Sequence, residues 1–177
     1  MTRIHVLGAA GSGTSTLGAS LAARLDLPHV EADDVFWLPT EPPFTTRRPL
    51  AARRKLLRQR CPIDGHWVFS GSALRWGTPI ERSYDLIVYL WLDPARRMAR
   101  LGRREAERYG GRIQPGGDMA TSSAQFLAWA AAYDTAGPEQ RSRVSHEQWL
   151  ADQTAPIVRL DSTAPVDDLV DAVFAVL

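Results

Sequence analysis

The sequence predicts an α/β fold in which helices cover both faces of a parallel sheet. Short apolar runs of strand length alternate along the chain with stretches whose apolar residues recur at helical spacing. A glycine-rich turn separates the first strand from the first helix, and residues 86–92 (LIVYLWL) are apolar on both alternating faces, as in a strand buried on both sides. Ligands of such folds bind at the carboxyl ends of the strands, so the residues that follow each strand are the candidate site.

The alternation can be followed element by element. Strands are expected at residues 4–7, 29–31, 66–70, 86–92 and 157–160, and helices at 15–25, 50–60, 94–109, 121–133, 142–152 and 166–176. Asp93 and Pro94 mark the start of the helix that follows the fourth strand. Residues 39–49, rich in proline and turn formers, are expected to form a loop.

The composition is that of an ordinary globular domain. The chain has 177 residues, 45% of them hydrophobic and 23% charged, with a net charge of +1. One domain, residues 1–177, is expected, and disordered, fibrous and membrane classes are excluded. The single cysteine, Cys61, and the absence of a signal-like N-terminal segment favour the cytoplasm. Cys61 itself fits a semi-buried thiol better than a nucleophile.

The stretch from residue 3 to 17 carries the clearest chemical signal. Gly8, Gly13 and Ser15 fit the pattern G-x-x-x-x-G-K-[ST] of phosphate-binding loops, but Thr14 occupies the lysine position. Glycines let successive N–H groups turn inward around phosphate oxygens, the following helix points its positive end at the same place, and the Ser15 hydroxyl is a candidate Mg²⁺ ligand. The expected nucleotide-binding residues are Gly8, Gly11, Ser12, Gly13, Thr14, Ser15 and Thr16. The alternative is a glycine-rich turn without a ligand.

Without the lysine, another cation must offset the charge that develops during phosphoryl transfer. Arg100, Arg103 and Arg104 lie three and four residues apart on the predicted helix 94–109, so they share one face. We expect at least one of them to act on the phosphates from a lid, placed at about residues 100–120. A solvated helix face is the alternative. The PGGDM stretch around Asp118 is either a hinge of this lid or a turn before the next helix.

The molecule that receives the phosphoryl group, here called the acceptor, is expected to bind at about residues 33–62. This region is the acceptor side of the site. Asp33 is a candidate orienting group or base for the acceptor, and the neighbouring Asp34 is a candidate to bind Mg²⁺ through water, although both fit a helix cap as well. Residues 47–60 carry seven basic side chains and no acid, which suits an anionic acceptor such as a nucleoside monophosphate. The predicted substrate-binding residues are Asp34, Trp37, Arg53 and Ser72. Trp37, Trp76 and Trp129 fit either a base-stacking role or the core, and His5 and His29 lack the spacing of a zinc site.

Four stretches carry a resemblance to a known family: GAAGSGTSTL, EADDVFW, WVFSGS and LDPARRMARLGRREAERYG. The chain resembles P-loop kinases of the adenylate kinase and shikimate kinase type, and is similar in particular to bacterial adenylate-kinase-like proteins, also labelled AAA-family ATPases. These share GSGTST, SGS, a GRIxPGGDM-like loop and a YD segment, here Tyr133, Asp134 and Gly137.

The resemblance implies a three-layer P-loop NTPase fold with strand order 2-3-1-4-5, ATP and Mg²⁺ as ligands, a short acceptor region and a small lid. Two departures stand out. Thr14 replaces the loop lysine, and Ser70-Gly71 stands where nucleotide kinases of this type commonly have Asp-Gly.

The leading hypothesis is an ATP-dependent kinase of a small, anionic acceptor. A nucleotide-binding switch or degenerate kinase with little turnover is the main alternative, because the lysine is missing. A nucleic-acid-binding module would exploit the arginines, but the near-neutral net charge argues against it. A small-molecule acceptor is therefore the expected partner, without nucleic acid or membrane, and both a monomer and a homodimer stay open.

Overall fold

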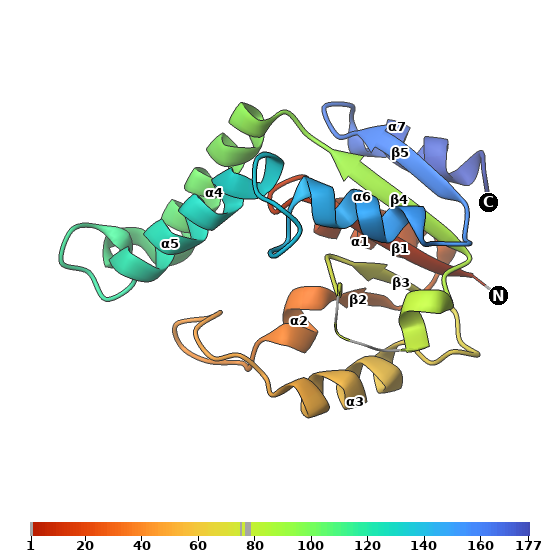
Figure 1. The fold of residues 1–177 in the computed structure, drawn as a ribbon, viewed down its shortest axis with the longest axis horizontal. Coiled ribbons are helices and arrows are strands. Elements are labelled where there is room, and N and C mark those ends of the chain that lie inside the picture. The colour runs from red at the N-terminus through yellow and green to blue at the C-terminus, as the bar shows by residue number, and fades with distance from the viewer. Residues whose placement is uncertain (1, 75, 77–78) are drawn as a thin grey trace.

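The computed structural model describes residues 2–74, 76 and 79–177 and contains a five-stranded parallel sheet. Its strands are β1 (Arg3–Gly8), β2 (His29–Glu31), β3 (Trp67–Ser70), β4 (Leu86–Trp91) and β5 (Ile157–Asp161). They lie in the order β2-β3-β1-β4-β5, and every neighbouring pair is parallel (Figure 1). The predicted fold class and the predicted strand order are both confirmed.

Seven α-helices are described. They are α1 (Thr14–Leu25), α2 (Ala32–Phe36), α3 (Leu50–Arg60), α4 (Pro94–Tyr109), α5 (Ala120–Ala131), α6 (Arg143–Ala151) and α7 (Val166–Phe174). Short 3-10 turns stand at η1 (Pro79–Arg82), η2 (Gly110–Ile113) and η3 (Ala132–Asp134). The bounds of α3 and β2 are those expected from the sequence. The helix α2 is not among the helices expected above, but it agrees with the helix-cap alternative for Asp33 and Asp34, which lie in its first turn, where acidic residues favour a helix.

The sheet separates two apolar cores, which makes the domain three layers thick. Alternate residues of β1 point to opposite faces: Ile4 and Val6 belong to one core, and Leu7 belongs to the other. Side chains of α1 and α7 complete the first core, and side chains of α2, α3 and α6 complete the second. The central strands are therefore buried on both faces, as their apolar patterns predict.

The strand register brings the ends of three strands to one edge of the sheet. Val6 of β1 lies beside Ser70 of β3, and Ser70 lies beside Glu31 of β2. On the other side of β1, Gly8 lies beside Leu90. The turns that follow β1, β2 and β3 therefore emerge together, at the edge of the sheet where the site is expected.

The helices α4 and α5 pack as a hairpin that projects from the body of the domain (Figure 1). Asp93 begins α4 by accepting a hydrogen bond from the Arg96 amide at 3.0 Å, and Pro94 occupies the first turn, as predicted. Residues 100–120, expected as a lid, form the outer part of this hairpin up to the first residue of α5. Within the described residues, no helix is both long and apolar enough to cross a membrane.

Candidate functional site

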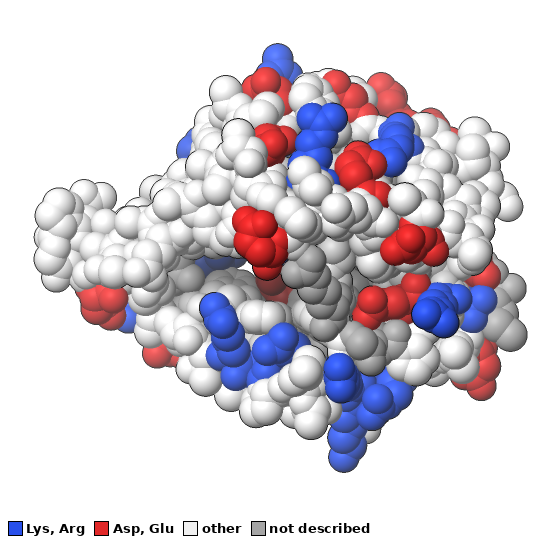
Figure 2. All heavy atoms as spheres, viewed as in Figure 1, with Lys and Arg blue, Asp and Glu red and all other residues white. Residues whose placement is uncertain are grey.

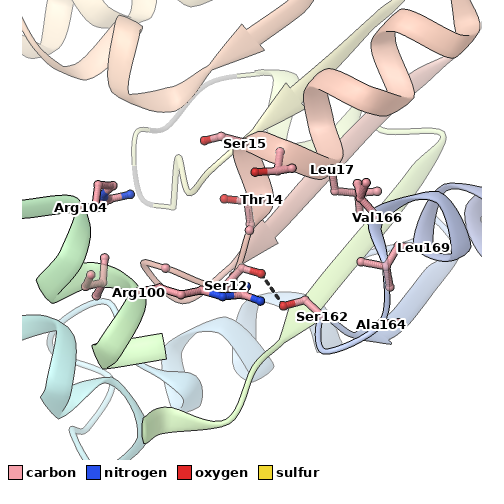
Figure 3. Close-up of a pocket in the computed structure, with 14 residues that line it drawn as sticks. Ser12, Thr14, Ser15, Leu17, Arg100, Arg104, Ser162, Ala164, Val166 and Leu169 are labelled. Carbon is pink, nitrogen blue, oxygen red and sulfur yellow. Dashed lines mark hydrogen bonds between the residues drawn. The ribbon is translucent and has the colours of Figure 1, made fainter. Parts of the chain in front are cut away.

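The glycine-rich turn forms a cradle between β1 and α1. Gly11 and Gly13 have φ angles of 83° and 95°, a region that favours glycine, and this backbone turns the loop around the start of α1. Gly8 lies beneath the loop, where a Cβ atom would come within 2.5 Å of Ser12 Oγ. The Ser12 carbonyl accepts a hydrogen bond from Ser162 Oγ at 2.6 Å, which ties the loop to the turn after β5 (Figure 3).

The cradle opens into a cavity of about 400 Å³. Loop and α1 residues form its floor, Arg100, Leu101 and Arg104 of α4 form one wall, and the segment after β5 forms the opposite wall (Figure 3). Its lining includes the predicted residues Gly11, Ser12, Gly13, Thr14, Ser15 and Thr16, together with Ser162, Ala164, Val166 and Leu169. The volume is in the range of small-molecule sites.

Two of the three predicted lid arginines line this cavity. Arg100 extends toward the loop, and a Cβ atom built on Gly13 would lie 3.9 Å from Arg100 Nη1. Arg104 stands one turn further along α4 (Figure 3). Arg103 is exposed and does not line the cavity. The expected common face of the three arginines is therefore divided, because only positions 100 and 104 of α4 face the loop.

Arg97 fastens α4 to the cradle. Its guanidinium is 1% exposed, and it donates to the carbonyls of Ala10 at 3.3 Å and Ala130 at 2.9 Å. It also donates to Asp134 Oδ2 at 2.9 Å. The loop, the arginine helix and the end of α5 therefore meet at one buried side chain. The YD segment noted in the sequence thus has a structural role, because Asp134 neutralises the buried Arg97.

Ser15, the predicted metal ligand, lies next to a carboxylate that the sequence analysis did not select. Ser15 Oγ donates to Glu31 Oε2 at 2.9 Å, which joins the start of α1 to the end of β2. Both groups offer oxygen atoms, the ligand type that Mg²⁺ prefers, and Mg²⁺ commonly binds proteins through one or two such groups while substrate phosphates and water complete its shell. Within the described residues, no group of three His, Cys, Asp or Glu side chains is placed to hold a metal ion alone.

A second arginine pair faces Asp33. Burial lowers the pKa of Arg104, and burial also lowers the pKa of Arg141, while the Asp33 carboxylate raises both and offsets part of this effect. The Nε atoms of Arg104 and Arg141 are buried and have no hydrogen-bond partner within the described chain. Asp33 itself is exposed on α2. Two cations with spare donors and one carboxylate therefore lie on the acceptor side of the cradle.

The remaining predicted substrate residues occupy different settings on the acceptor side. Asp34 is exposed, and its Oδ2 lies 3.8 Å from Arg60 Nη1. Trp37 is half-buried, with its ring 4.8 Å from that of Phe36. Arg53 lies over the Phe36 ring at 4.0 Å.

Ser72 is buried in the turn that follows β3, and His146 is its hydrogen-bond partner.

Figure 2 shows basic side chains over α3 and a hollow between α3 and the α4–α5 hairpin.

The tip of the hairpin contacts the loop of residues 38–46. Tyr109 Oη donates to the Pro43 carbonyl at 2.9 Å, and Arg112 Nη1 donates to Glu41 Oε1 at 3.0 Å. Arg112 also forms a two-pronged pair with Asp118, at 3.0 and 2.6 Å. Asp118 therefore shapes the turn at the tip, in agreement with the alternative of a turn before α5.

Several open alternatives are decided by burial. The Cys61 thiol is buried, and desolvation raises its pKa to about 12, so it is a structural thiol. Trp76 belongs to the core. Trp129 lies instead under the Arg141 guanidinium at 4.5 Å. His5 contacts the Gly71 carbonyl, and His29 contacts Ser70 Oγ at the end of β3.

Comparison with other proteins assigns this chain to a family. The uncharacterized protein YqaC of Bacillus subtilis (strain 168) is 42% identical over 170 residues, which span 96% of this chain and 94% of that protein. The chain belongs to the YqaC family. No protein-family model matches the sequence of this chain.

The fold of this chain is also that of small-molecule kinases with a P-loop. A deoxyadenosine kinase from M. mycoides with bound dATP superimposes with a TM-score of 0.60 at 14% identity, covering 98% of both chains. A gluconokinase from Sinorhizobium meliloti 1021 gives 0.54 at 17% identity, covering 98% of this chain and 90% of that one. A shikimate kinase from Bacteroides thetaiotaomicron gives 0.53 at 17% identity, covering 99% and 97%. At these identities the likeness establishes the fold of this chain and not its activity.

Sequence reasoning missed five residues of this site: Glu31, Arg97, Arg141, His146 and Ser162. Glu31 could have been found, because it ends a predicted strand at the sheet edge where ligands bind. Arg141 has no such signal, since it lies in the connection between η3 and the Ser142 cap of α6. Only the folded chain brings it opposite Asp33.

Proposed function

We propose that this YqaC-family protein is an ATP- and Mg²⁺-dependent kinase that transfers the γ-phosphoryl group of ATP to a small, anionic acceptor. The observation that carries the proposal is the position of Arg100 and Arg104, which line the cavity of a phosphate-type cradle whose lysine position is threonine. The positive charge that Thr14 lacks is therefore supplied by these two arginines of α4.

The cradle fits the phosphates of a nucleotide. The amino end of α1 favours anionic oxygens, and a volume of about 400 Å³ suits a molecule of this size. Arg100 and Arg104 each offer a planar set of donors that can hold phosphate oxygens in pairs. The apolar wall of Ala164, Val166 and Leu169 suits the rest of the nucleotide.

Ser15 and Glu31 fit a magnesium ion. Their oxygens already lie within hydrogen-bond distance, so Ser15 would be a direct ligand and Glu31 would bind directly or through water. When bound together with a nucleotide, Mg²⁺ would offset the negative charge of the phosphates. Glu31 also holds the Ser15 hydroxyl at the amino end of α1.

On the acceptor side, Asp33 orients the attacking oxygen, and Arg104 and Arg141 stabilise the negative charge that spreads over the transferred group. Both guanidinium groups have a spare donor in a desolvated setting, where an electrostatic contact is stronger than in water. The basic side chains around α3 favour an anionic acceptor, and a nucleoside monophosphate is the first candidate.

The test is acceptor-dependent formation of ADP. The purified protein is incubated with ATP and Mg²⁺ and with a panel of nucleoside monophosphates, nucleosides, sugar acids and other small hydroxyl compounds. We expect turnover with one class of acceptor and loss of turnover in Asp33→Asn. ATP binding without turnover for any acceptor would reject the kinase.

Thr14 also favours a second candidate, a nucleotide-binding switch or degenerate kinase with little turnover. Isothermal titration with ATP, with and without Mg²⁺, distinguishes this from a scaffold that binds nothing. Tight binding combined with an inactive acceptor panel supports the switch. The variant Thr14→Lys adds a direct comparison, because it gains neither affinity nor activity if the arginines already act in place of the lysine.

The proposed partner is a small molecule, without nucleic acid or membrane, because the net charge is only +1 and α3 is the main basic surface in view. A monomer and a homodimer are both compatible with this site, and light scattering during gel filtration distinguishes them. The proposed compartment is the cytoplasm, in keeping with a buried, unpaired Cys61.

A further inference from the structure

Three different histidines hold the turn that follows β3, residues 70–72. His29 Nε2 lies 2.9 Å from Ser70 Oγ, and His5 Nε2 lies 2.8 Å from the Gly71 carbonyl. His146 Nε2 lies 3.3 Å from Ser72 Oγ. Because β3 lies between β2 and β1 in the sheet, this turn emerges between the segment that follows β2, where the acceptor is expected, and the loop that follows β1. Three of the four histidines of the chain converge on three consecutive residues.

The contact with Ser72 is the end of a longer buried chain. Tyr89 Oη lies 3.0 Å from Tyr133 Oη, and Tyr133 Oη lies 2.7 Å from His146 Nδ1. The ring of His146 is fully buried, and burial, Arg141 and His5 together lower its pKa to about 3, so the ring is neutral. A neutral imidazole donates at one nitrogen and accepts at the other.

The distances indicate which nitrogen carries the proton. O–H donors make shorter hydrogen bonds than N–H donors, with usual lengths near 2.7–2.8 Å and 2.9–3.0 Å. The 2.7 Å contact fits Tyr133 donating its hydroxyl proton to Nδ1, and the 3.3 Å contact fits Nε2–H donating to Ser72 Oγ. Tyr133 then accepts from Tyr89. Burial raises the pKa of both tyrosines, so each hydroxyl keeps the proton that this direction requires.

The direction of the chain determines what Ser72 can offer. Its oxygen accepts from His146, and the structure gives its proton no acceptor among the described residues. Ser72 is 8% exposed, and the charge of Arg141 reaches His146, the direct partner of Ser72. A hydroxyl proton without a partner among the described residues points to a hydrogen-bond acceptor on a bound molecule.

We propose that Tyr89, Tyr133 and His146 act as positioning residues that fix Ser72 as a hydrogen-bond donor to an oxygen atom of the acceptor. Ser72 is then a specificity-determining contact, and it selects an acceptor that presents an oxygen to its hydroxyl proton. This inference rests on the proposed kinase function for its ligand, whereas the direction of the buried chain stands independently of that function.

The first measurement addresses the direction alone. Long-range ¹H–¹⁵N NMR spectra of the uniformly labelled protein between pH 6 and 8 report which ring nitrogen of each histidine is protonated. We expect His146 to be neutral with its proton on Nε2. The Tyr133→Phe variant removes the donor to Nδ1 and is expected to change the ¹⁵N shift of that nitrogen. A proton on Nδ1 in the unaltered protein would overturn the inference whatever the activity.

The second measurement uses the acceptor found in the ADP assay. Ser72→Ala is expected to lower kcat/KM for the acceptor about 10- to 100-fold, the value of one hydrogen bond to a charged group, with KM for ATP within twofold. His146→Asn places its amide near Nδ1 and is expected to behave like Ser72→Ala. His146→Gln retains a donor near Nε2 and is expected to stay within about threefold of the parent, the range of a conserved hydrogen bond.

Tyr84→Phe is the matched control, because it also removes one buried tyrosine hydroxyl, but one that has no partner within the described residues. It is expected to leave the kinetics unchanged, while Tyr133→Phe lowers kcat/KM for the acceptor. Equal effects of His146→Gln and His146→Asn, or acceptor kinetics unaffected by Ser72→Ala, would overturn the positioning role. A protein without acceptor-dependent turnover rejects the proposed function and the ligand of Ser72 with it, while the NMR result still decides the direction of the chain.

Discussion

Asp134 Oδ2 accepts a hydrogen bond from Arg97 Nη2 at 2.9 Å, although the two residues are separated by most of the α4–α5 hairpin. Arg97 also donates to the loop carbonyl of Ala10, so this ion pair determines the position of α4 relative to the glycine-rich loop. The pair has one almost fully buried partner, and removal of the other leaves a charge without compensation.

The first prediction concerns this pair. Asp134→Ala is expected to lower the free energy of unfolding by about 2–3 kcal/mol, because Arg97 keeps its burial but loses its counter-charge. Urea denaturation followed by fluorescence measures this. Glu147→Ala is the control, since its pair with Arg159 is exposed and is expected to contribute less than about 1 kcal/mol. Similar losses in the two variants would contradict the role given to Arg97.

The second prediction compares arginines on one helix. Arg100→Ala and Arg104→Ala are each expected to weaken ATP binding about tenfold or more, the value of a charge-assisted hydrogen bond to phosphate. Arg103→Ala removes the same charge from the exposed side of α4 and is expected to stay within about twofold. Isothermal titration at fixed ionic strength gives the three affinities. If Arg103→Ala weakens binding as strongly as the others, the effect is one of net charge.

The third prediction separates stability from activity. Burial disfavours the charged form of Arg141, so Arg141→Met is expected to leave the melting temperature unchanged or to raise it. Acceptor-dependent turnover is expected to fall at least about 100-fold, because a cation facing the transferred group is lost. Arg143→Met, two residues further on and exposed, serves as the control. A large drop in the melting temperature of Arg141→Met would indicate a structural role.

The fourth prediction concerns magnesium. Glu31→Gln keeps a hydrogen-bond acceptor for Ser15 but removes the negative charge, and it is expected to raise the Mg²⁺ concentration needed for half-maximal ATP binding about tenfold. Titration of ATP affinity against Mg²⁺ measures the shift. ATP affinity without Mg²⁺ is expected to rise or stay equal, since a carboxylate near the phosphates has gone. A uniform loss at all Mg²⁺ concentrations argues against a metal role.

The fifth prediction is a dependence of stability on pH. Burial lowers the pKa of His5 to about 4 and that of His146 to about 3, against 6.5 for an unperturbed histidine. The unfolded chain therefore binds more protons than the folded one below pH 6.5, and stability is full above this pH and is lost as the pH falls toward 4. For His5 alone the loss approaches about 3 kcal/mol. Urea denaturation between pH 4.5 and 7.5 measures the slope.

His146→Gln is expected to reduce this slope, because glutamine does not titrate. His66→Gln is the control, since His66 is exposed. An unchanged slope in His146→Gln, with an altered one in His66→Gln, would place the acid sensitivity elsewhere.

The fold could be predicted from the sequence because its signals are local and repeated. The apolar β1 and β4, the glycine turn and the Asp93-Pro94 start of α4 each follow from a few neighbouring residues. The five-residue helix α2 could not, because it is too short to display a helical period. Tertiary contacts stabilise it instead, including the Arg48 guanidinium that binds the carbonyls of Val35 and Trp37.

The site was predictable only where it is continuous in sequence. The cradle residues follow one motif, whereas Glu31, Arg141 and His146 come from three separate elements and share no spacing. The division of Arg100 and Arg104 from Arg103 has a similar cause. Helical spacing shows which residues share a face of α4. The packing of Arg97 and Leu101 against the loop determines which of these faces lines the cavity.

The contacts of Tyr109 with Pro43 and of Arg112 with Glu41 join the outer end of α4 to the loop beside the acceptor region. Any tilt of α4 that brings Arg100 and Arg104 closer to a nucleotide therefore displaces this loop as well. Under the proposed kinase function, binding of the nucleotide would then change the free energy of binding the acceptor, and by linkage each ligand would change the affinity of the other by the same factor. The hairpin tip would thus couple the two proposed binding events thermodynamically.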